Sequence, residues 1–389
     1  MRRLGFWVAM LVLTLLVLEG VAWLAFATAL RGKQLRWRDL DDLGPVPTQA
    51  EMDHWRTWGW DRELGWLRRP NTEETVRDPR GDWHVSVDSR GARREPLSAP
   101  GGVVSAYGDS FTFGHEVDDD QTWPHYLSER LGTRVDNWGQ SAWGPDQALL
   151  RLARNLPHER TAVVVIAIMS ENIARLMNSY RPFLTGDPAM KMAFKPMLAL
   201  DDGDLVWQPN PLIRADTPAD WEAAIAQARA TDVWYRENAA RVRARFPHLL
   251  RLPEALAYAV RHPTRPNLYE RPDAVARLDH LLDELTRLGD AHDFLPVVLF
   301  IPEPSDLRRF AAGTPTRYRD YVFASRGRSA STRLVVLDLL EHPFDVARFN
   351  RRPFKDHPSP YGQRVIAEAL ATALGDFPPV RSLLARSQD

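Results

Sequence analysis

The stretch Gly108-Asp109-Ser110-Phe111-Thr112-Phe113-Gly114 lies directly after a short apolar run, residues 103–107, which predicts a buried strand. A helical pattern begins soon afterwards, near Asp120. Ser110 would therefore lie on the turn after a central strand, at the carboxyl edge where open α/β sheets bind their ligands. Its hydroxyl would be exposed there, so we expect Ser110 to be a nucleophile. Asp109 is expected to bond the backbone of the turn rather than to act as a catalytic acid.

The composition describes a folded protein and excludes several classes of site. Of 389 residues, 44% are hydrophobic and 26% are charged, as in ordinary globular domains. The net charge of −1 gives no electrostatic reason to expect nucleic acid as a partner. Cysteine is absent, which excludes disulfides, thiolate metal sites and a cysteine nucleophile. The histidines do not show metal-ligand spacing, so we infer neither a metal nor a cofactor.

Residues 5–30 form an apolar run whose only charge is Glu19. Twenty-six residues are enough to cross a bilayer, and the run is longer than the apolar region of a signal peptide. We predict an uncleaved, single-pass anchor, although the small residues at 25–29 would also suit a peptidase. Arginines flank both ends, so the charge rule does not decide the orientation. By analogy with exported bacterial enzymes, we expect an inner-membrane protein whose domain lies outside the cytoplasm.

From residue 103 onward, predicted strands alternate with predicted helices. The strand at 162–169 is an unbroken apolar run of the kind that is buried on both faces of a sheet. Further strands are expected at 295–301 and 333–339, and helices at 121–131, 147–155 and 361–374. This alternation predicts a parallel, three-layer α/β/α sheet of flavodoxin-like type.

The chain divides into five expected parts. They are an anchor (1–32), a lead-in segment with a strand at 83–87 (33–97), the first part of the α/β domain (98–182), a mainly helical insertion over one edge of the sheet (183–290), and the second part of the domain (291–389). Two long helices are expected in or near the insertion, at 218–245 and 272–288.

Four polar blocks each follow a predicted strand or open a helix. They are Gly108-Asp109-Ser110, Asn137-Trp138-Gly139-Gln140-Ser141, Ser170-Glu171-Asn172, and Asp356-His357-Pro358-Ser359-Pro360-Tyr361-Gly362. A serine hydroxyl needs a base to take its proton, and His357 is the candidate. Attack on an ester carbonyl places negative charge on oxygen, which preorganised donors must meet.

The order of these blocks resembles the SGNH/GDSL hydrolase family, and the flanking residues look like its membrane-anchored bacterial members. Relatives of those, of the alginate O-acetyltransferase type, modify exopolysaccharides. The resemblance implies an SGNH-type α/β/α fold with Ser110 as nucleophile and His357 as base. It also implies an oxyanion hole formed by the backbone N–H groups of Ser110 and Gly139 and by the side-chain amide of Asn172.

The sequence departs from the family pattern at the catalytic acid. The family usually has an aspartate two or three residues before the histidine, where this chain has Phe354 and Lys355. Asp356, the adjacent residue, is the predicted partner of His357, although neighbouring side chains tend to point apart. More distant alternatives are Asp345 and Asp338, and a Ser–His dyad oriented by a backbone carbonyl is a further one. The third block also departs, with Ser170 and Ile173 where the family often has Gly and Asp.

Three other features have a less specific interpretation. Ser141 lies in a near miss to the G-x-S-x-G elbow and is not expected to be the nucleophile. The run 115–120, with its histidine and acidic residues, is expected to be a solvated loop that caps the next helix rather than a metal site. Trp138 and Trp143 border Gly139, so we expect them to contact substrate, with core packing as the alternative.

These observations predict a membrane-anchored serine esterase that hydrolyses an acylated carbohydrate or another small ester at the cell envelope. An O-acetyltransferase of a surface polysaccharide would use the same acyl-enzyme, with a sugar hydroxyl in place of water. The third hypothesis is a non-catalytic polysaccharide-binding protein with a degenerate site, and the altered fourth block is the reason to keep it.

Overall fold

The computed structural model describes residues 2–31, 45–98, 102–201, 204–239, 241, 243–261, 267–329, 332–350 and 357–375. Its centre is a five-stranded parallel sheet with the order β11-β10-β7-β5-β6. The strands are β5 (Val104–Gly108), β6 (Val135–Asn137), β7 (Val163–Met169), β10 (Leu295–Ile301) and β11 (Val335–Asp338). Every residue of β5, β6 and β7 is buried, as expected for strands with helices on both faces.

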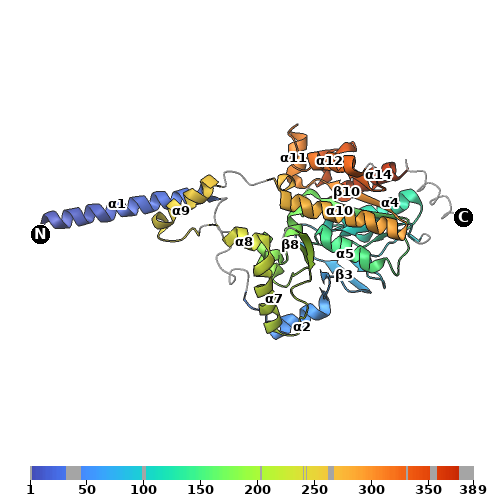
Figure 1. Cartoon of the computed structure of the whole chain (residues 1–389), viewed down its shortest axis with the longest axis horizontal. Coiled ribbons are helices and arrows are strands. Elements are labelled where there is room, and N and C mark those ends of the chain that lie inside the picture. The colour runs from blue at the N-terminus through green and yellow to red at the C-terminus, as the bar shows by residue number, and fades with distance from the viewer. Residues whose placement is uncertain are drawn as a thin grey trace.

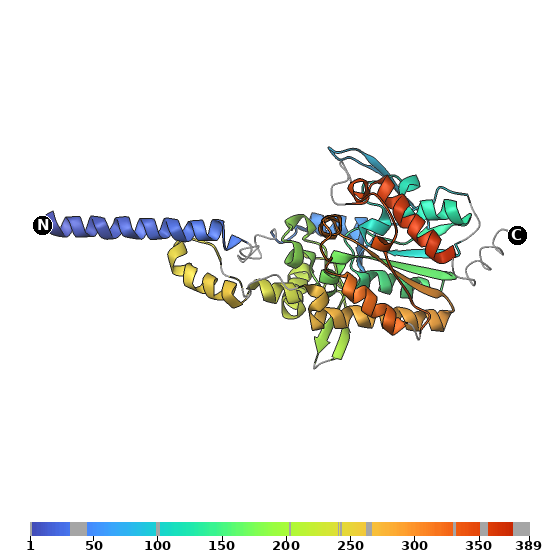
Figure 2. The ribbon, with the colours of Figure 1, turned by 90° about the horizontal axis from the view of Figure 1, so that it is seen from above.

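Helices cover both faces of this sheet, so the predicted three-layer α/β/α architecture is confirmed (Figures 1 and 2). One layer contains α5 (Pro145–Asn155) and α10 (Pro272–His292), and the opposite layer contains α4 (Trp123–Leu131) and α14 (Pro360–Gly375). Smaller elements complete the domain: α3 (Ser110–Phe113), η3 (Asp119–Gln121), η4 (Ser170–Met177), α11 (Pro304–Ala311), α12 (Arg319–Ser329), η7 (Leu339–Glu341) and α13 (Val346–Phe349).

The structure differs in detail from the predicted helices. The N-cap of α4 is Thr122, whose side chain accepts from the His125 N–H, and Asp120 lies in the preceding 3₁₀ turn. The helix α10 fell within the predicted insertion, yet its apolar side packs into the main core beneath the sheet. It therefore belongs to the α/β layers rather than to the segment that interrupts them.

The segment before α10 contains several short elements instead of one long helix. They are α6 (Arg181–Thr185), η5 (Pro188–Met190), the hairpin β8 (Met197–Asp201) and β9 (Asp204–Gln208), α7 (Pro218–Thr231), α8 (Val233–Ala239), α9 (His248–Arg261) and η6 (Leu268–Glu270). The helix predicted at 218–245 breaks at Asp232, which has an extended backbone. Its buried carboxylate accepts from the N–H groups of Trp234 and Tyr235, and so begins α8.

The lead-in segment packs against the α/β domain at the loop that follows Ser110 and α3. It contains α2 (Gln49–Trp58), the short pair β1 (Trp60–Asp61) and β2 (Gly65–Trp66), and the hairpin β3 (Thr72–Val76) and β4 (Trp83–Val87). The strand predicted at 83–87 is therefore confirmed. Beyond it, Arg93 forms an isolated bridge with Asn137 at the end of β6.

At the N-terminus, the helix α1 (Arg2–Ala27) extends away from the domain, and α9 lies beside its C-terminal part (Figures 1 and 2). Residues Arg3–Ala27 are long and apolar enough to cross a membrane, the one such helix among the residues described. This criterion rests on length and composition and would also be met by a signal sequence.

Candidate active site

Ser110 lies at the carboxyl end of β5, at the first position of the four-residue helix α3. Asp109 is the N-cap of that helix, and its Oδ1 accepts from the Phe111 N–H at 2.9 Å. The expectation that Asp109 bonds the backbone of the turn is therefore confirmed. The Ser110 N–H belongs to the first turn of α3, so it has no acceptor within the helix.

Two glycines allow the backbone segments around Ser110 to approach one another. A Cβ on Gly108 would lie 2.8 Å from the Ala167 carbonyl oxygen of β7. A Cβ on Gly139 would lie 2.4 Å from the Phe113 nitrogen of α3. The close neighbour of Gly139 is therefore the backbone of α3. Both glycines therefore fix the position of the turn.

His357 reaches Ser110 from the segment that leads into α14. Its Nε2 lies 3.1 Å from the Ser110 hydroxyl oxygen, within hydrogen-bond distance. The imidazole packs edge-on against Phe111, with ring centroids 5.7 Å apart. The structure thus brings together two residues that are 247 positions apart in the sequence.

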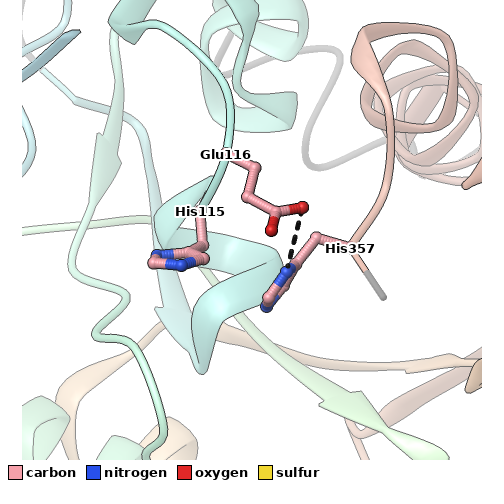
Figure 3. A group of neighbouring side chains, drawn as sticks. All are labelled: His115, Glu116 and His357. Atoms are coloured by element: carbon pink, nitrogen blue, oxygen red, sulfur yellow. Dashed lines mark ion pairs between the residues drawn. The ribbon is translucent and has the colours of Figure 1, made fainter. Parts of the chain in front are cut away.

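The carboxylate that faces the other nitrogen of His357 is Glu116. Its Oε2 lies 3.4 Å from His357 Nδ1, and Figure 3 shows the two side chains pointing toward each other. The distance exceeds that of a tight charge-assisted hydrogen bond, and such contacts commonly shorten when substrate binds. Glu116 Oε1 is 2.6 Å from Arg80 Nη2, on the turn of the β3–β4 hairpin. Ser110, His357 and Glu116 therefore form a Ser–His–carboxylate series.

The electrostatics of this group favour a charged Glu116 and a neutral His115. Burial by itself would raise the pKa of Glu116, but His357 and Arg80 outweigh it and bring that pKa below its usual value. Burial, together with the neighbouring His357, lowers the pKa of His115 to about 4. Of these two neighbours of His357, only Glu116 therefore has a charge that could balance a protonated imidazole.

Arg93 holds the loop that carries Glu116. Its guanidinium donates to the carbonyl oxygens of Phe113, Gly114 and Val117 at 2.5–2.7 Å. It also pairs with Asp119 at 2.7 Å, and its side chain is almost fully buried. Together with a bond to the His84 carbonyl, these contacts fix the chain on both sides of Glu116, whose φ of 70° lies in the left-handed region.

The rest of the run 115–120 binds the lead-in hairpin. Asp118 accepts from the His84 N–H at 2.6 Å, and Asp119 accepts from the Ser86 N–H at 3.0 Å. Gln121 and Asp118 also form a capping box for η3. The loop thus caps the next turn of helix as predicted, but it is not solvated, because Glu116, Val117 and Asp119 are buried. Glu116 also has a further contact that the prediction did not include.

The predicted oxyanion donors differ in whether their N–H groups are already used in hydrogen bonds within the protein. The Asn172 side chain is buried, and its amide nitrogen donates one of its two hydrogens to Asp109 Oδ2 at 2.9 Å. The Gly139 N–H donates to Asn137 Oδ1 at 3.0 Å and is therefore already engaged. Arg175 also reaches Asp109 Oδ2, at 3.3 Å, and supports the cap from the side of η4.

The two more distant carboxylates that we named as alternative partners of His357 have other partners in the structure. Asp356 lies outside the described residues. Asp338 accepts from the Tyr318 hydroxyl at 2.7 Å and from Arg319 at 2.6 Å. Asp345 accepts from the Ala347 N–H at 3.0 Å and caps α13. Neither of these last two is the partner, because each carboxylate has a structural role elsewhere.

Trp138 and Trp143 were expected to contact substrate, and their burial contradicts that expectation. Trp138 is 2% exposed, stacks on Tyr107, and lies between the guanidinium groups of Arg90 and Arg151. Trp143 is fully buried, and its indole N–H donates to the Trp66 carbonyl at 2.9 Å. Core packing, the alternative interpretation, describes both side chains.

His115, Glu116 and His357 also form a group whose ligand atoms lie within 4.8 Å of one another (Figure 3). Zinc requires ligands at about 2.0–2.2 Å, so the three side chains would have to move together to bind it. In the structure each already has another neighbour: Ser110 for His357, Arg80 for Glu116, and Ser141, at 3.4 Å, for His115. The arrangement suits proton transfer better than metal binding.

Sequence reasoning missed Glu116, Arg80 and Arg93. The loop 115–120 was noted for its acidic residues, but nothing in it distinguishes one carboxylate from the others. The family that the sequence resembles has its acid just before the histidine, whereas Glu116 lies six residues after Ser110.

No protein-family model matches the sequence, and no curated protein matches it. Among solved structures, a putative lipolytic protein of the G-D-S-L family from Desulfitobacterium hafniense DCB-2 is 13% identical, with 69% of this chain and 97% of that chain covered and a TM-score of 0.33. The salicylyl-acyltransferase SsfX3 from a tetracycline biosynthetic pathway is 12% identical, with coverages of 73% and 58% and a TM-score of 0.28. TesA is 17% identical, with coverages of 49% and 98% and a TM-score of 0.17. At such TM-scores these likenesses carry no argument, and the functional proposal rests on the site.

Proposed function

We propose that the protein is a serine ester hydrolase of the SGNH type, with Ser110 as nucleophile, His357 as base and Glu116 as the carboxylate that orients His357. The observation that carries this proposal is the continuous series Glu116 Oε2, His357 Nδ1, His357 Nε2 and Ser110 Oγ, with separations of 3.4 and 3.1 Å. A binding protein without catalytic activity would not need a carboxylate beside His357. The missing aspartate shortly before His357 therefore does not argue against catalysis.

In the first half of the reaction, Ser110 Oγ attacks the ester carbonyl carbon while its proton passes to His357 Nε2. Glu116 stabilises the imidazolium from the side of Nδ1. The negative oxygen of the tetrahedral intermediate is met by the Ser110 N–H and by the remaining N–H of the Asn172 amide. The intermediate collapses to an acyl-serine, and the alcohol leaves with the proton from His357.

In the second half, water takes the place of the alcohol. His357 removes a proton from this water, which attacks the acyl carbon, and the same donors hold the oxyanion. Collapse returns the proton to Ser110 and releases the carboxylic acid. A sugar hydroxyl in place of this water would give acyl transfer by the same steps.

The apolar helix α1 supports a location at the cell envelope. We propose that it anchors the domain in the bacterial inner membrane, with the site outside the cytoplasm. The substrate would then be an acylated carbohydrate or another small ester of the envelope.

The test is turnover and labelling of the full chain in detergent or vesicles. The wild type should hydrolyse 4-nitrophenyl acetate and become labelled by a fluorophosphonate at Ser110. Ser110→Ala should lose both, with turnover lower by about 10⁴-fold or more. Ser141→Ala is the matched control, because it removes the other serine near the histidines and should retain activity. A wild type that neither turns over nor becomes labelled would overturn the proposal.

The acceptor is identified in the same preparation. An acetylated and an unacetylated oligosaccharide are offered together, and the products are analysed by mass spectrometry. Free acetate without newly acetylated sugar supports hydrolysis. Acetyl groups on the second sugar would instead identify the protein as an acyltransferase.

A further inference from the structure

Glu19, the one charge within the apolar helix α1, has a defined set of partners. One carboxylate oxygen accepts from the His248 N–H at 2.6 Å and from His248 Nδ1 at 2.7 Å, and the other accepts from the Leu249 N–H at 2.9 Å. These N–H groups belong to the first turn of α9, where helices have no internal acceptors. An ionisable side chain in a membrane span normally has such a partner, because leaving it alone in hydrocarbon is costly. The contact therefore fixes α9 against α1.

The depth of this contact follows from helix geometry. Glu19 lies eight residues before Ala27, the end of α1, which corresponds to about 12 Å along the helix axis. The hydrocarbon core of a bilayer is about 30 Å thick. If α1 spans a membrane, the first turn of α9 lies within the hydrocarbon region rather than above it.

The sides of α9 differ in the way that this location requires. Leu252, Ala255 and Ala259 pack with Phe26 and Leu30 of the α1 segment. Next to that contact side lie Leu256 (48% exposed) and Val260 (79%), and Phe246 (76%) comes just before the helix. The charged residues of the helix, Arg251, Glu254 and Arg261, occupy the remaining side together with Leu250 (74%).

The exposed apolar side of α9 is a neighbour of the exposed apolar surface of α1. Trp23 and Leu24 of α1 are each more than half exposed, and Figures 1 and 2 both show α9 alongside this part of the helix. The same nonpolar medium would cover both surfaces, because they adjoin.

We propose that α9 is a second membrane-bound element: its first turn lies among the acyl chains of the bilayer that α1 spans, and Leu256 and Val260 lie level with the C-terminal end of α1, where the hydrocarbon meets the headgroups. The inference rests on the proposed anchor but not on the proposed chemistry. Glu19 caps α9 within the bilayer, and the polar side of α9 faces the headgroups and water. The catalytic domain is then held to the membrane at two points.

The absence of cysteine makes the test direct, because any introduced cysteine is the only one in the chain. Val260→Cys and Leu256→Cys report the outward apolar side, and Glu254→Cys is the matched control on the polar side. Each full-length variant is labelled with the fluorophore NBD and reconstituted in vesicles of phosphatidylethanolamine and phosphatidylglycerol. Quenching is measured with brominated acyl chains and, separately, with aqueous iodide.

We expect at least twofold more quenching by brominated lipid at residues 256 and 260 than at 254, and the reverse order with iodide. Equal quenching at the three positions would overturn the proposal. Protection from both quenchers at 256 and 260 would also overturn it, because a second protein copy would then cover this side.

Leu16→Cys in α1 separates this inference from the anchor itself. Lipid quenching at 16 without quenching at 256 and 260 would leave a single-helix anchor and reject the role of α9. The absence of lipid quenching at all three positions would reject both. Because none of these signals requires turnover, failure of the proposed esterase activity would be recognised separately.

Glu19→Ala in the Val260→Cys background tests the cap. We expect lower lipid quenching at residue 260, because the first turn of α9 loses its acceptor within the bilayer. Unchanged quenching would contradict the role assigned to Glu19.

Discussion

The turn that carries the nucleophile and the loop that carries the carboxylate are adjacent in the chain but are held in different ways. Ser110 is positioned by its own neighbours: the buried strand β5, the Asp109 cap and the short helix α3. Glu116 has a left-handed backbone and is positioned from outside, by Arg93 and by Arg80 of the lead-in segment. A nucleophile on a local turn can therefore be recognised in a sequence, whereas a carboxylate held by distant contacts cannot.

The largest effect is expected where the loop depends on one buried side chain. Arg93→Met would leave the carboxylate of Asp119 buried without its cation and would remove the hydrogen bonds to four backbone carbonyl oxygens. We expect the free energy of unfolding to fall by about 3–5 kcal/mol. Chemical denaturation followed by tryptophan fluorescence measures it.

Arg94→Met is the matched control for that variant. Arg94 is the next residue in the chain, its side chain is half exposed, and its nearest carboxylate is 3.8 Å away. Such a surface pair contributes roughly 0–1 kcal/mol. Equal losses for the two variants would show that Arg93 does not hold the loop.

On the side of the nucleophile, Asn172→Ala removes the proposed side-chain oxyanion donor. With 4-nitrophenyl acetate as substrate, we expect kcat to fall by about 10²–10³-fold, because the lost hydrogen bond is made in the transition state. KM should change little. A raised KM with unchanged kcat would mean that Asn172 binds the ground state, or only supports Asp109.

The smallest effect is expected at Arg80, the half-exposed residue that pairs with Glu116. Arg80→Ala removes a half-exposed partner of Glu116, so kcat should fall by about 2- to 5-fold. Arg77→Ala, on the same hairpin but more exposed and paired with Asp82 instead, should have no effect. A loss as large as that of Asn172→Ala would mean that Arg80 does more than hold Glu116.

The sequence was sufficient to predict the sheet, because runs such as 162–169 are long, apolar and flanked by helical patterns. It also pointed to Ser110 and His357, and the structure brings these two side chains within 3.1 Å of each other. The break at Asp232 was missed because a buried capping carboxylate looks like any other acidic residue before it folds. Trp138 and Trp143 were misplaced because proximity to Gly139 in the sequence says nothing about which way a side chain points.

Glu116 could not be identified from the sequence for a similar reason. Its position depends on a positive φ and on the hydrogen bonds from Arg93, and neither leaves a pattern along the chain. The predicted partners Asp356, Asp345 and Asp338 all precede His357 in the same part of the chain, whereas Glu116 lies on the loop that follows α3.

The most direct test of this account compares Glu116→Gln with Asp356→Asn in the hydrolysis of the chromogenic ester. Both changes replace a carboxylate by an amide of similar shape. We predict that the rate of turnover falls by about 10²–10⁴-fold in Glu116→Gln and is nearly unchanged in Asp356→Asn. A large loss for Asp356→Asn, with Glu116→Gln close to the wild type, would contradict the assignment of Glu116 to His357.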